Sequence, residues 1–364
     1  MTATEQNALH THASRPSPTS CVPFIRPVRS GDLDAVLALA ERGGSGLTSL
    51  PPERDTLADK IAASEAAICS SEARERGSAI MLVAEVGEIV VATGMIFARV
   101  GAEWPFYSYR LTRQAAVSRA LGRHRAQKVL NLVNDFDGEV EVGGLLVDPA
   151  MRGRSIGRLM ARARYLFIGR HRDWFANRVM AELRGWQDEA GHSPVWEAIG
   201  RHFYDMDFHE ADRTGAIQGN QFIADLGPRY PLYVSMLSAA AQQALGQPHD
   251  DGRPARDMLL EEGFRDEGYV DIFDGGPTLV ADIDALRTLR RAISGRIAGL
   301  SDDLARGEQM LLSSGHGASF SAAVSRVEVE AATVPGEPCA VVIERGVAEA
   351  IGASEGEILC LTAQ

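Results

Sequence analysis

The stretch VDPAMRGRSIGRLM, residues Val147–Met160, joins the end of an apolar strand to the start of an arginine-rich helix. A helix start carries unpaired backbone N–H groups and partial positive charge, which together favour an anion. Arg152 and Arg154 add cationic side chains that can bind phosphate. The backbone can approach a ligand closely because small residues follow at Gly153, Ser155 and Gly157. The stretch therefore predicts either a phosphate cradle or a solvated helix start.

The spacing of its glycines separates this loop from two common phosphate motifs. A P-loop ends in Gly-Lys-Ser or Gly-Lys-Thr, and no such triplet follows here. The dinucleotide-binding motif needs a different glycine spacing and an early strand, whereas this strand comes late in the chain. A pyrophosphate held by a different kind of loop remains compatible with the pattern.

Two adjacent glycines, Gly143 and Gly144, interrupt the otherwise β-favouring run 139–147. Each glycine inside a strand costs roughly 0.5–1 kcal/mol relative to alanine, so a pair of them needs a reason. We expect a β-bulge or a ligand pressed against the backbone. Close packing by a neighbouring side chain is the alternative.

Composition limits the classes of partner. The chain has 364 residues, 45% of them hydrophobic, which is enough for one large domain with an appendage or for two domains. Its net charge of −12 repels nucleic acid and anionic membranes, so a polyanion has to bind at a local basic patch. The four cysteines are scattered without metal-ligand or redox spacing, and we predict a reducing, cytoplasmic location and no metal site.

The ends of the chain differ in character from its middle. Residues 1–21 are polar, rich in Ser, Thr and Pro, and lack the apolar segment of a signal peptide, so we expect a disordered extension. No apolar run approaches the roughly 20 residues that cross a bilayer. The stretch from about 310 onward is rich in β-favouring residues. The expected organisation is one large domain over 22–300 and a small β-rich subdomain over 301–364.

Hydrophobic periodicity predicts the elements between these ends. Strands are expected over 24–28, 78–86, 88–100, 139–147, 177–185, 205–212 and 265–273. Helices are expected over 32–42, 55–67, 118–133, 153–169, 193–203 and 254–262. A helix, an aromatic stop and a strand over 196–208 recur over 255–273, which suggests that two similar units build one sheet.

The bulged strand and the Arg-x-x-Ser-x-Gly loop resemble those of the GNAT acyltransferases, whose loop holds acyl-CoA. This resemblance implies an α+β fold, a mixed twisted sheet flanked by helices, elaborated here by the β-rich part. It implies that Leu145, Val147, Arg152, Gly153, Arg154, Ser155 and Gly157 bind the coenzyme. Ser155 stands where that loop usually has glycine.

Several further stretches narrow the resemblance, among them PFYSYR, LLVDP, AELRG, SPVWEAIGRHFYDMDF, GQPHDDGRPAR and YVDIFDGGPTL. In order, from about Phe24 to Leu279, they look like the arginine N-succinyltransferase family. The resemblance implies that succinyl-CoA and L-arginine give CoA and N2-succinylarginine, with no tightly bound cofactor. It also implies that Leu145 contacts succinyl-CoA and that His249 is the proton donor.

The acceptor and the succinyl group carry charges that need partners. Arg110 is a candidate for a carboxylate, or else a surface arginine stacked on aromatic rings. Ser49, with Thr48, can line the acceptor pocket or simply cap a helix. Four carboxylates at expected strand ends are candidates for binding the guanidinium, and each can instead be a turn or cap residue. They are Asp205, Asp207, Asp271 and Asp274, of which Asp207 and Asp274 are the preferred pair.

Three other functions compete with this one. An ornithine or broad basic-amino-acid succinyltransferase would have the same motifs, because the pockets differ only by a guanidinium. A non-catalytic acyl-CoA-binding subunit is the second, although the retained His249 argues against it. A nucleic-acid binder using the arginines of 152–172 is the third, and the acidic remainder disfavours it. A homodimer or a complex with a sister subunit is plausible, with the β-rich part as its interface.

Overall fold

The computed structural model describes residues 22–43, 49–188, 190–208, 210–211, 214–215, 221–330 and 337–364. The expected extension over 1–21 therefore lies outside the described residues, as does Thr48. One continuous sheet runs the length of the elongated molecule, in the order β12-β15-β11-β14-β13-β1-β2-β3-β6-β7-β10-β9-β4-β5-β8. In the described part of the chain no helix is long and apolar enough to span a bilayer.

The N-terminal part supplies one side of the central sheet. Its strands are β1 (Phe24–Pro27), β2 (Ala79–Val86) and β3 (Ile89–Phe97), and its helices are α1 (Leu33–Gly43), α2 (Arg54–Cys69) and α3 (Ser71–Glu75), with the short turn η1 (Ser30–Asp32) before α1. The expected strands and helices here are confirmed. β2 and β3 meet in a two-residue turn, Gly87 and Glu88, in which both φ angles are positive, as a tight hairpin requires.

Successive residues of β2 alternate between two hydrophobic cores. Ile80 and Leu82 pack in the cluster that contains α4 (Ile156–Arg170), whereas Met81 and Val83 pack in the cluster that contains α1 and α2. A strand buried on both faces has neighbours on both sides of the sheet. The central sheet is therefore a middle layer, with α4 on one face and α1 and α2 on the other.

The second half of the central sheet follows the quoted stretch. It contains β6 (Val140–Val147), η2 (Pro149–Met151), α4, η3 (Arg172–Trp174), β7 (Arg178–Glu182), α10 (Arg253–Glu262), β9 (Arg265–Asp271) and β10 (Pro277–Asp282). β7 pairs with β6 in parallel and with β10 antiparallel, so the sheet is mixed. The predicted α+β class, a twisted mixed sheet flanked by helices, is confirmed.

The helix expected over 118–133 is wrong. This segment forms β5 (Arg123–Val133), which pairs along its whole length with β4 (Ser108–Ser118), and their hairpin projects from the molecule. Alanine, lysine and leucine favour helix, but a complete ladder with β4 outweighs their small intrinsic preferences.

The strand expected over 205–212 is also wrong. α5 (Pro194–Ala198) and α6 (Gly200–Tyr204) are followed by another helical turn, which Asp207 caps by accepting a hydrogen bond from the Glu210 amide at 2.8 Å. The proposed recurrence of helix, aromatic stop and strand therefore fails in its first copy. The rest of this lobe consists of α8 (Gln221–Leu226), β8 (Leu232–Tyr233), η4 (Val234–Met236), α9 (Ala239–Ala244) and η5 (Asp250–Gly252).

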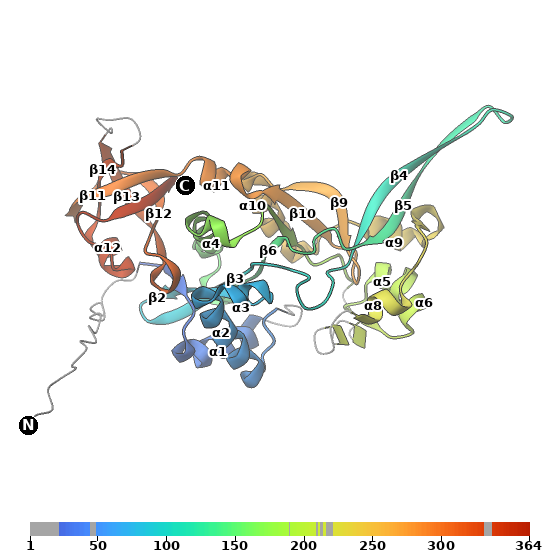
Figure 1. Cartoon of the computed structure of the whole chain (residues 1–364), viewed down its shortest axis with the longest axis horizontal. Helices are drawn as coiled ribbons and strands as arrows, with labels where there is room; N and C mark the ends of the chain where they lie inside the picture. The colour runs from blue at the N-terminus through green and yellow to red at the C-terminus, as the bar shows by residue number, and fades with distance from the viewer. Residues whose placement is uncertain are drawn as a thin grey trace, which may run out of the picture.

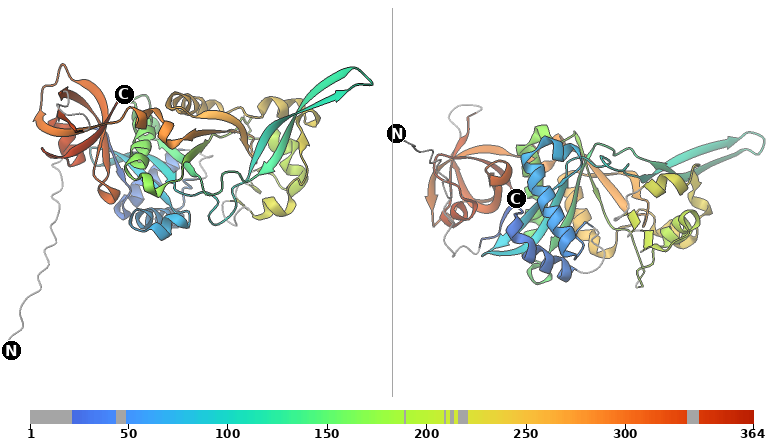
Figure 2. Two further views of the ribbon diagram at one scale, coloured as in Figure 1. Left: turned by 45° about the horizontal axis from the view of Figure 1, so that its top comes forward. Right: turned by 60° about the horizontal axis from the view of Figure 1, so that its bottom comes forward.

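The C-terminal strands form a closed unit at the other end of the molecule (Figure 2). Five strands close because β12 pairs with both β15 and β13; they are β11 (Ile293–Ser301), β12 (Glu308–Ser314), β13 (Ser321–Glu330), β14 (Cys339–Glu344) and β15 (Ile358–Ala363). The remaining elements are η6 (Ile283–Ala285), α11 (Arg287–Arg290), η7 (Gly317–Ser319) and α12 (Arg345–Ile351). By its pairing β11 belongs to this unit, so the unit starts before residue 301.

Candidate functional site

The glycine pair in β6 forms the bulge expected from its sequence. Thr93 of β3 pairs with Leu146, whereas Met95 pairs with Gly143, so β6 holds one extra residue at this point. Gly144 has a φ of +57°, and a Cβ atom there would lie 2.8 Å from Met95. The Thr93 hydroxyl donates a hydrogen bond to the Gly144 carbonyl at 3.2 Å. Because of this bend, a larger residue does not fit at Gly144.

The bulge lies where β6 and β7 stop pairing. Their parallel ladder is limited to Val140 with Val179 and Glu141 with Met180. In the described part of the chain, the edge of β6 that faces β7 has no strand partner beyond Glu141, so a ligand can approach the backbone there. Arg164 of α4 stabilises the bend, since its Nη1 donates a hydrogen bond to the Gly143 carbonyl at 2.9 Å.

The loop after β6 turns back on itself before α4 begins. Asp148 starts it by accepting a hydrogen bond from the Ala150 amide at 2.9 Å and by pairing with Arg42 of α1 at 2.9 Å. Gly153 and Ser155 have φ angles of +79° and +60°. Left-handed residues within a turn are a feature of the backbone concavities that bind anions.

The groups of this loop are free to receive an anion. In the described part of the chain, no acceptor lies within hydrogen-bonding distance of the amides of Gly153, Ile156 and Gly157. Arg152 and Arg154 are exposed, and neither pairs with a carboxylate of the described residues. Unpaired amides, the positive helix end and two free guanidinium groups favour the phosphate-cradle interpretation of the loop.

Leu145 and Val147 connect the bulge to this loop. Both are partly buried and pack against the core that contains α4. A Cβ atom at Gly157 would lie 3.5 Å from Val147, so the first turn of α4 passes close over the end of β6. The structure thus brings all seven expected coenzyme-binding residues into one segment.

His249 lies beside the end of β7. Its amide donates a hydrogen bond to the Arg184 carbonyl at 2.8 Å. The preceding residue, Pro248, forms an isolated antiparallel β-bridge with Gly185. Its imidazole Nδ1 accepts a hydrogen bond from the Asp251 amide at 3.2 Å. A neutral imidazole with an accepting Nδ1 carries its proton on Nε2. The half-buried ring therefore carries an Nε2–H hydrogen-bond donor beside the end of β7.

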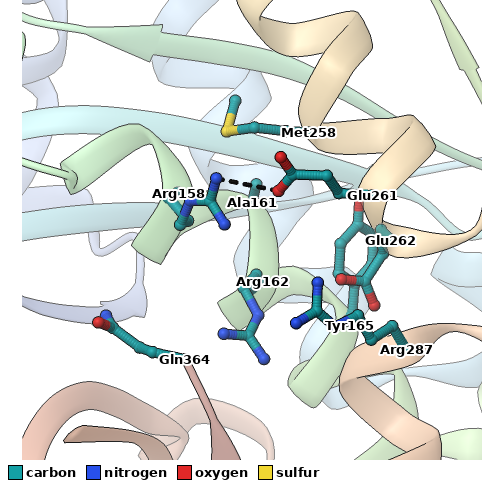
Figure 3. A pocket seen from close by; sticks show the side chains of 9 residues that line it. All are labelled: Arg158, Ala161, Arg162, Tyr165, Met258, Glu261, Glu262, Arg287 and Gln364. Atoms are coloured by element: carbon teal, nitrogen blue, oxygen red, sulfur yellow. Dashed lines mark ion pairs between the residues drawn. The ribbon is translucent and has the colours of Figure 1, made fainter.

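A hollow beside a later part of α4 is lined by none of the residues predicted for the functional site. Figure 3 shows its lining, which comes from α4, α10, α11 and the C-terminus and includes Arg158 paired with Glu261 at 3.0 Å. No group of three His, Cys, Asp or Glu residues in the described ranges could hold a metal ion.

The comparisons with known proteins agree with one another. A family model described as arginine N-succinyltransferase beta subunit matches residues 23–288. The chain belongs to the arginine N-succinyltransferase family. It is 38% identical over 266 residues to arginine N-succinyltransferase subunit beta of Pseudomonas aeruginosa strain PAO1, covering 73% of this chain and 78% of that protein. It is 40% identical over 269 residues to arginine N-succinyltransferase of Enterobacter sp. strain 638, covering 74% of this chain and 78% of that protein.

A solved structure supports the fold of this family along almost the whole chain. The structure described as arginine/ornithine succinyltransferase subunit AI from Pseudomonas aeruginosa has a TM-score of 0.81 and 32% identity, and the match covers 94% of this chain and 98% of that one. The chain shares the fold of this succinyltransferase subunit, and the likeness extends beyond residue 288 into the C-terminal unit.

The residues expected to bind the acceptor are spread over separate parts of the chain. Asp274 is buried, and its two carboxylate oxygens accept hydrogen bonds from the Gly185 amide at 2.7 Å and the Gly276 amide at 2.8 Å. Asp207 is exposed and caps its helical turn, as described above. Arg110 pairs with Asp135 at 3.3 Å and lies over the Tyr269 ring. Ser49 is half-buried at the start of the segment before α2.

Two carboxylates that the sequence analysis did not select lie in the central sheet. Burial raises the pKa of Glu141 on β6 to about 7. Burial, with the nearby carboxylates of Asp271, Glu141 and Asp274, raises the pKa of Glu182 on β7 well above its usual value. The signal that could have found them is an acidic residue at an inward-facing position of a strand, which is unusual without a partner.

Proposed function

We propose that the protein transfers the succinyl group of succinyl-CoA to the α-amine of L-arginine, giving N2-succinylarginine and CoA. The observation that carries this proposal is the anion cradle at the start of α4, with unpaired amides and free arginines, directly after a bulged strand. Membership of the arginine N-succinyltransferase family supports the choice of acyl donor and acceptor.

Each part of the site has a task in this reaction. The cradle binds the diphosphate of the coenzyme, and the unpaired edge of β6 near Leu145 holds the thioester carbonyl. The neutral α-amine attacks that carbonyl, a C–N bond forms, and the C–S bond breaks. The proton that the attacking nitrogen loses passes to the departing thiolate, and Nε2–H of His249 stabilises that thiolate by donating a hydrogen bond to it. Positioning supplies most of the acceleration, because a thiolate is a fair leaving group.

A panel of acceptors tests this function. Purified protein is mixed with succinyl-CoA or acetyl-CoA and with L-arginine, L-ornithine, L-lysine or agmatine, and release of the CoA thiol is followed. We expect release with succinyl-CoA that depends on L-arginine. Agmatine has no α-carboxylate and no α-amine of the usual kind, so turnover with agmatine contradicts the proposed attack. Turnover with none of the amino acids favours the non-catalytic acyl-CoA-binding subunit.

One alternative acceptor has a specific observation behind it. The solved structure described above is named for arginine and ornithine together. L-Ornithine is therefore the second candidate, and the ratio of kcat/KM for the two amino acids decides between them. A cytoplasmic location stays a prediction. Assembly as a homodimer or with a sister subunit also stays a prediction, and size measurement of the protein alone and with such a subunit can test it.

A further inference from the structure

Three carboxylates lie on one face of the central sheet. They are Glu141 on β6, Glu182 on β7 and Asp271 on β9, called here the acidic cluster. Glu141 pairs with Met180, two residues before Glu182. Glu182 pairs with Thr278, which in turn pairs with Tyr269, two residues before Asp271. Paired residues share a face, as do residues two apart on a strand, so the three side chains point to the same side.

The charge of the acidic cluster is not balanced by the protein. In the described ranges no lysine, arginine or histidine forms an ion pair with any of its three members. The Thr278 hydroxyl donates to Glu182 at 3.3 Å, and the amides of Phe273 and Asp274 donate to Oδ1 of Asp271 at 2.7 and 2.8 Å; all three donors are neutral. Arg164 is the cation that acts on Glu141, but its Nη1 is bonded to the Gly143 carbonyl. Neighbouring carboxylates in a half-buried site repel one another unless a cation joins them.

A buried hydroxyl faces the same place. Ser108, the first residue of β4, pairs with Asp271, so its side chain lies on the face of the acidic cluster at a Cβ separation of roughly 5 Å. Ser108 is fully buried, and its Oγ has no hydrogen-bond partner in the described part of the chain. A hydroxyl in this position normally has a partner. Its orphaned Oγ is an independent sign that a hydrogen-bonding ligand completes the cluster.

The acidic cluster lies at a suitable distance from the reacting groups. Glu141 precedes Gly143 of the bulge by two residues, and Glu182 precedes Arg184, whose carbonyl anchors His249, by two residues. Two residues of a strand span roughly 6.6 Å. The five bonds from the Cα to the Cζ of an extended arginine span roughly 6 Å. An arginine can therefore reach the cluster while its α-amine lies near the thioester.

We infer that Glu182 and Asp271, with Glu141 beside them and the Ser108 hydroxyl as a further acceptor, bind the guanidinium of the acceptor L-arginine. This inference rests on the proposed function and adds the residues that select the substrate's side chain. A guanidinium has five N–H donors in a planar fork, which matches carboxylates placed around it. Asp274 is not part of this set, because backbone amides bond both of its carboxylate oxygens, whereas the amides of Phe273 and Asp274 bond only Oδ1 of Asp271.

The first test needs no variant. L-Citrulline has the shape of L-arginine with a neutral urea group in place of the guanidinium. In competition against L-arginine turnover by the whole protein, we expect L-citrulline to bind at least 100-fold more weakly than L-arginine. Equal binding of the two amino acids overturns the inference, whichever residues form the pocket.

The second test assigns the residues. We expect Glu182→Gln and Asp271→Asn each to raise the KM for L-arginine at least tenfold, with the Kd for succinyl-CoA unchanged, because the coenzyme lies at the other end of the site. Asp282→Asn removes an exposed carboxylate from β10 and is the matched control, with unchanged KM. Ser108→Ala leaves a smaller defect and keeps the test usable if a buried carboxamide prevents folding.

The outcomes separate this inference from the proposed function. If the wild-type protein transfers no succinyl group to L-arginine, the proposed function fails. If the wild type is active but Glu182→Gln and Asp271→Asn bind succinyl-CoA normally and keep the wild-type KM for L-arginine, the inference alone fails. A fall in kcat at unchanged KM also overturns it, since that result assigns these carboxylates to the chemical step.

Discussion

At the scale of single residues, His249 is held in one tautomer. Its Nδ1 accepts from the Asp251 amide, which leaves the proton on Nε2 and makes the ring a donor rather than a base. We expect His249→Gln to lower kcat by about 100-fold, because the departing thiolate then lacks the Nε2–H donor that stabilises it. The Kd for succinyl-CoA should stay within twofold, measured by calorimetry beside steady-state kinetics.

The control for this variant is an exposed histidine. His202→Gln changes a residue on α6 that none of the proposed steps uses. We expect it to keep wild-type kcat. A His249→Gln protein with full kcat would remove the imidazole from the mechanism.

Glu141 makes stability depend on pH. Burial raises its pKa to about 7 in the folded state, against an ordinary value of 4.5. The folded state therefore keeps a proton that the unfolded state has lost between these pH values, so stability is highest below pH 4.5 and falls as pH rises through 7. Relative to Glu141→Gln, we expect the wild-type free energy of unfolding to fall by about 1–3 kcal/mol across this window. Urea unfolding of both proteins from pH 4 to 8 measures it, and parallel curves contradict the shift.

At the scale of elements, the loop before α4 combines strain with binding. Ser155 has a φ of +60° and a ψ of 9°, a left-handed conformation that costs a residue with a side chain roughly 1 kcal/mol and costs glycine little. This explains why such loops usually have glycine at this position. We expect Ser155→Val to lower the free energy of unfolding by about 1–2 kcal/mol and Ser155→Gly not to lower it. Urea unfolding checks both, and equal losses contradict the strain.

Arg152 contributes to coenzyme binding from the same loop. Its exposed guanidinium has no carboxylate partner in the described part of the chain, so it is free to bond a phosphate. We expect Arg152→Ala to weaken CoA binding by about 1.5–3 kcal/mol, as for a lost charged hydrogen bond. Arg119→Ala, at the distant tip of the β4–β5 hairpin, is the control in the same titration. An unchanged Kd for Arg152→Ala would reject the phosphate role.

The elements of the site differ in how far sequence could predict them. The bulge and the loop follow from local cues, because glycines in a β-run and small residues at a helix start have few other uses. β5 was mistaken for a helix because its ladder with β4 is not visible in its own composition. The acidic cluster was missed because Glu141, Glu182 and Asp271 are far apart in sequence, and only the strand order β6-β7-β10-β9 brings them to one face.

At the scale of the whole molecule, the closed C-terminal unit is attached to the rest of the chain by strand pairing and by polar contacts of α4. β13 pairs with β1, which continues the sheet from one part into the other. Arg162 of α4 donates to the Thr288 hydroxyl at 2.9 Å and to the Ala363 carbonyl at 2.7 Å. Glu262 of α10 accepts from both the amide and the hydroxyl of Thr288. This network, beside the hollow of Figure 3, ties the helix that starts at the cradle to the C-terminal strand.

Arg162 therefore couples the catalytic part to the C-terminal unit, and its removal should be costly. Arg162→Ala leaves the Ala363 carbonyl and the Glu262 network without a buried cation, and we expect the free energy of unfolding to fall by about 3 kcal/mol. Arg158→Ala, one turn earlier on α4, removes an exposed ion pair with Glu261 and should cost less than about 1 kcal/mol. Urea unfolding of the two variants measures the difference. Equal losses would mean that other contacts hold the two parts together, such as the β1–β13 pairing and the bond from Arg170 to the Gly315 carbonyl, because the buried cation would then contribute no more than a surface charge does.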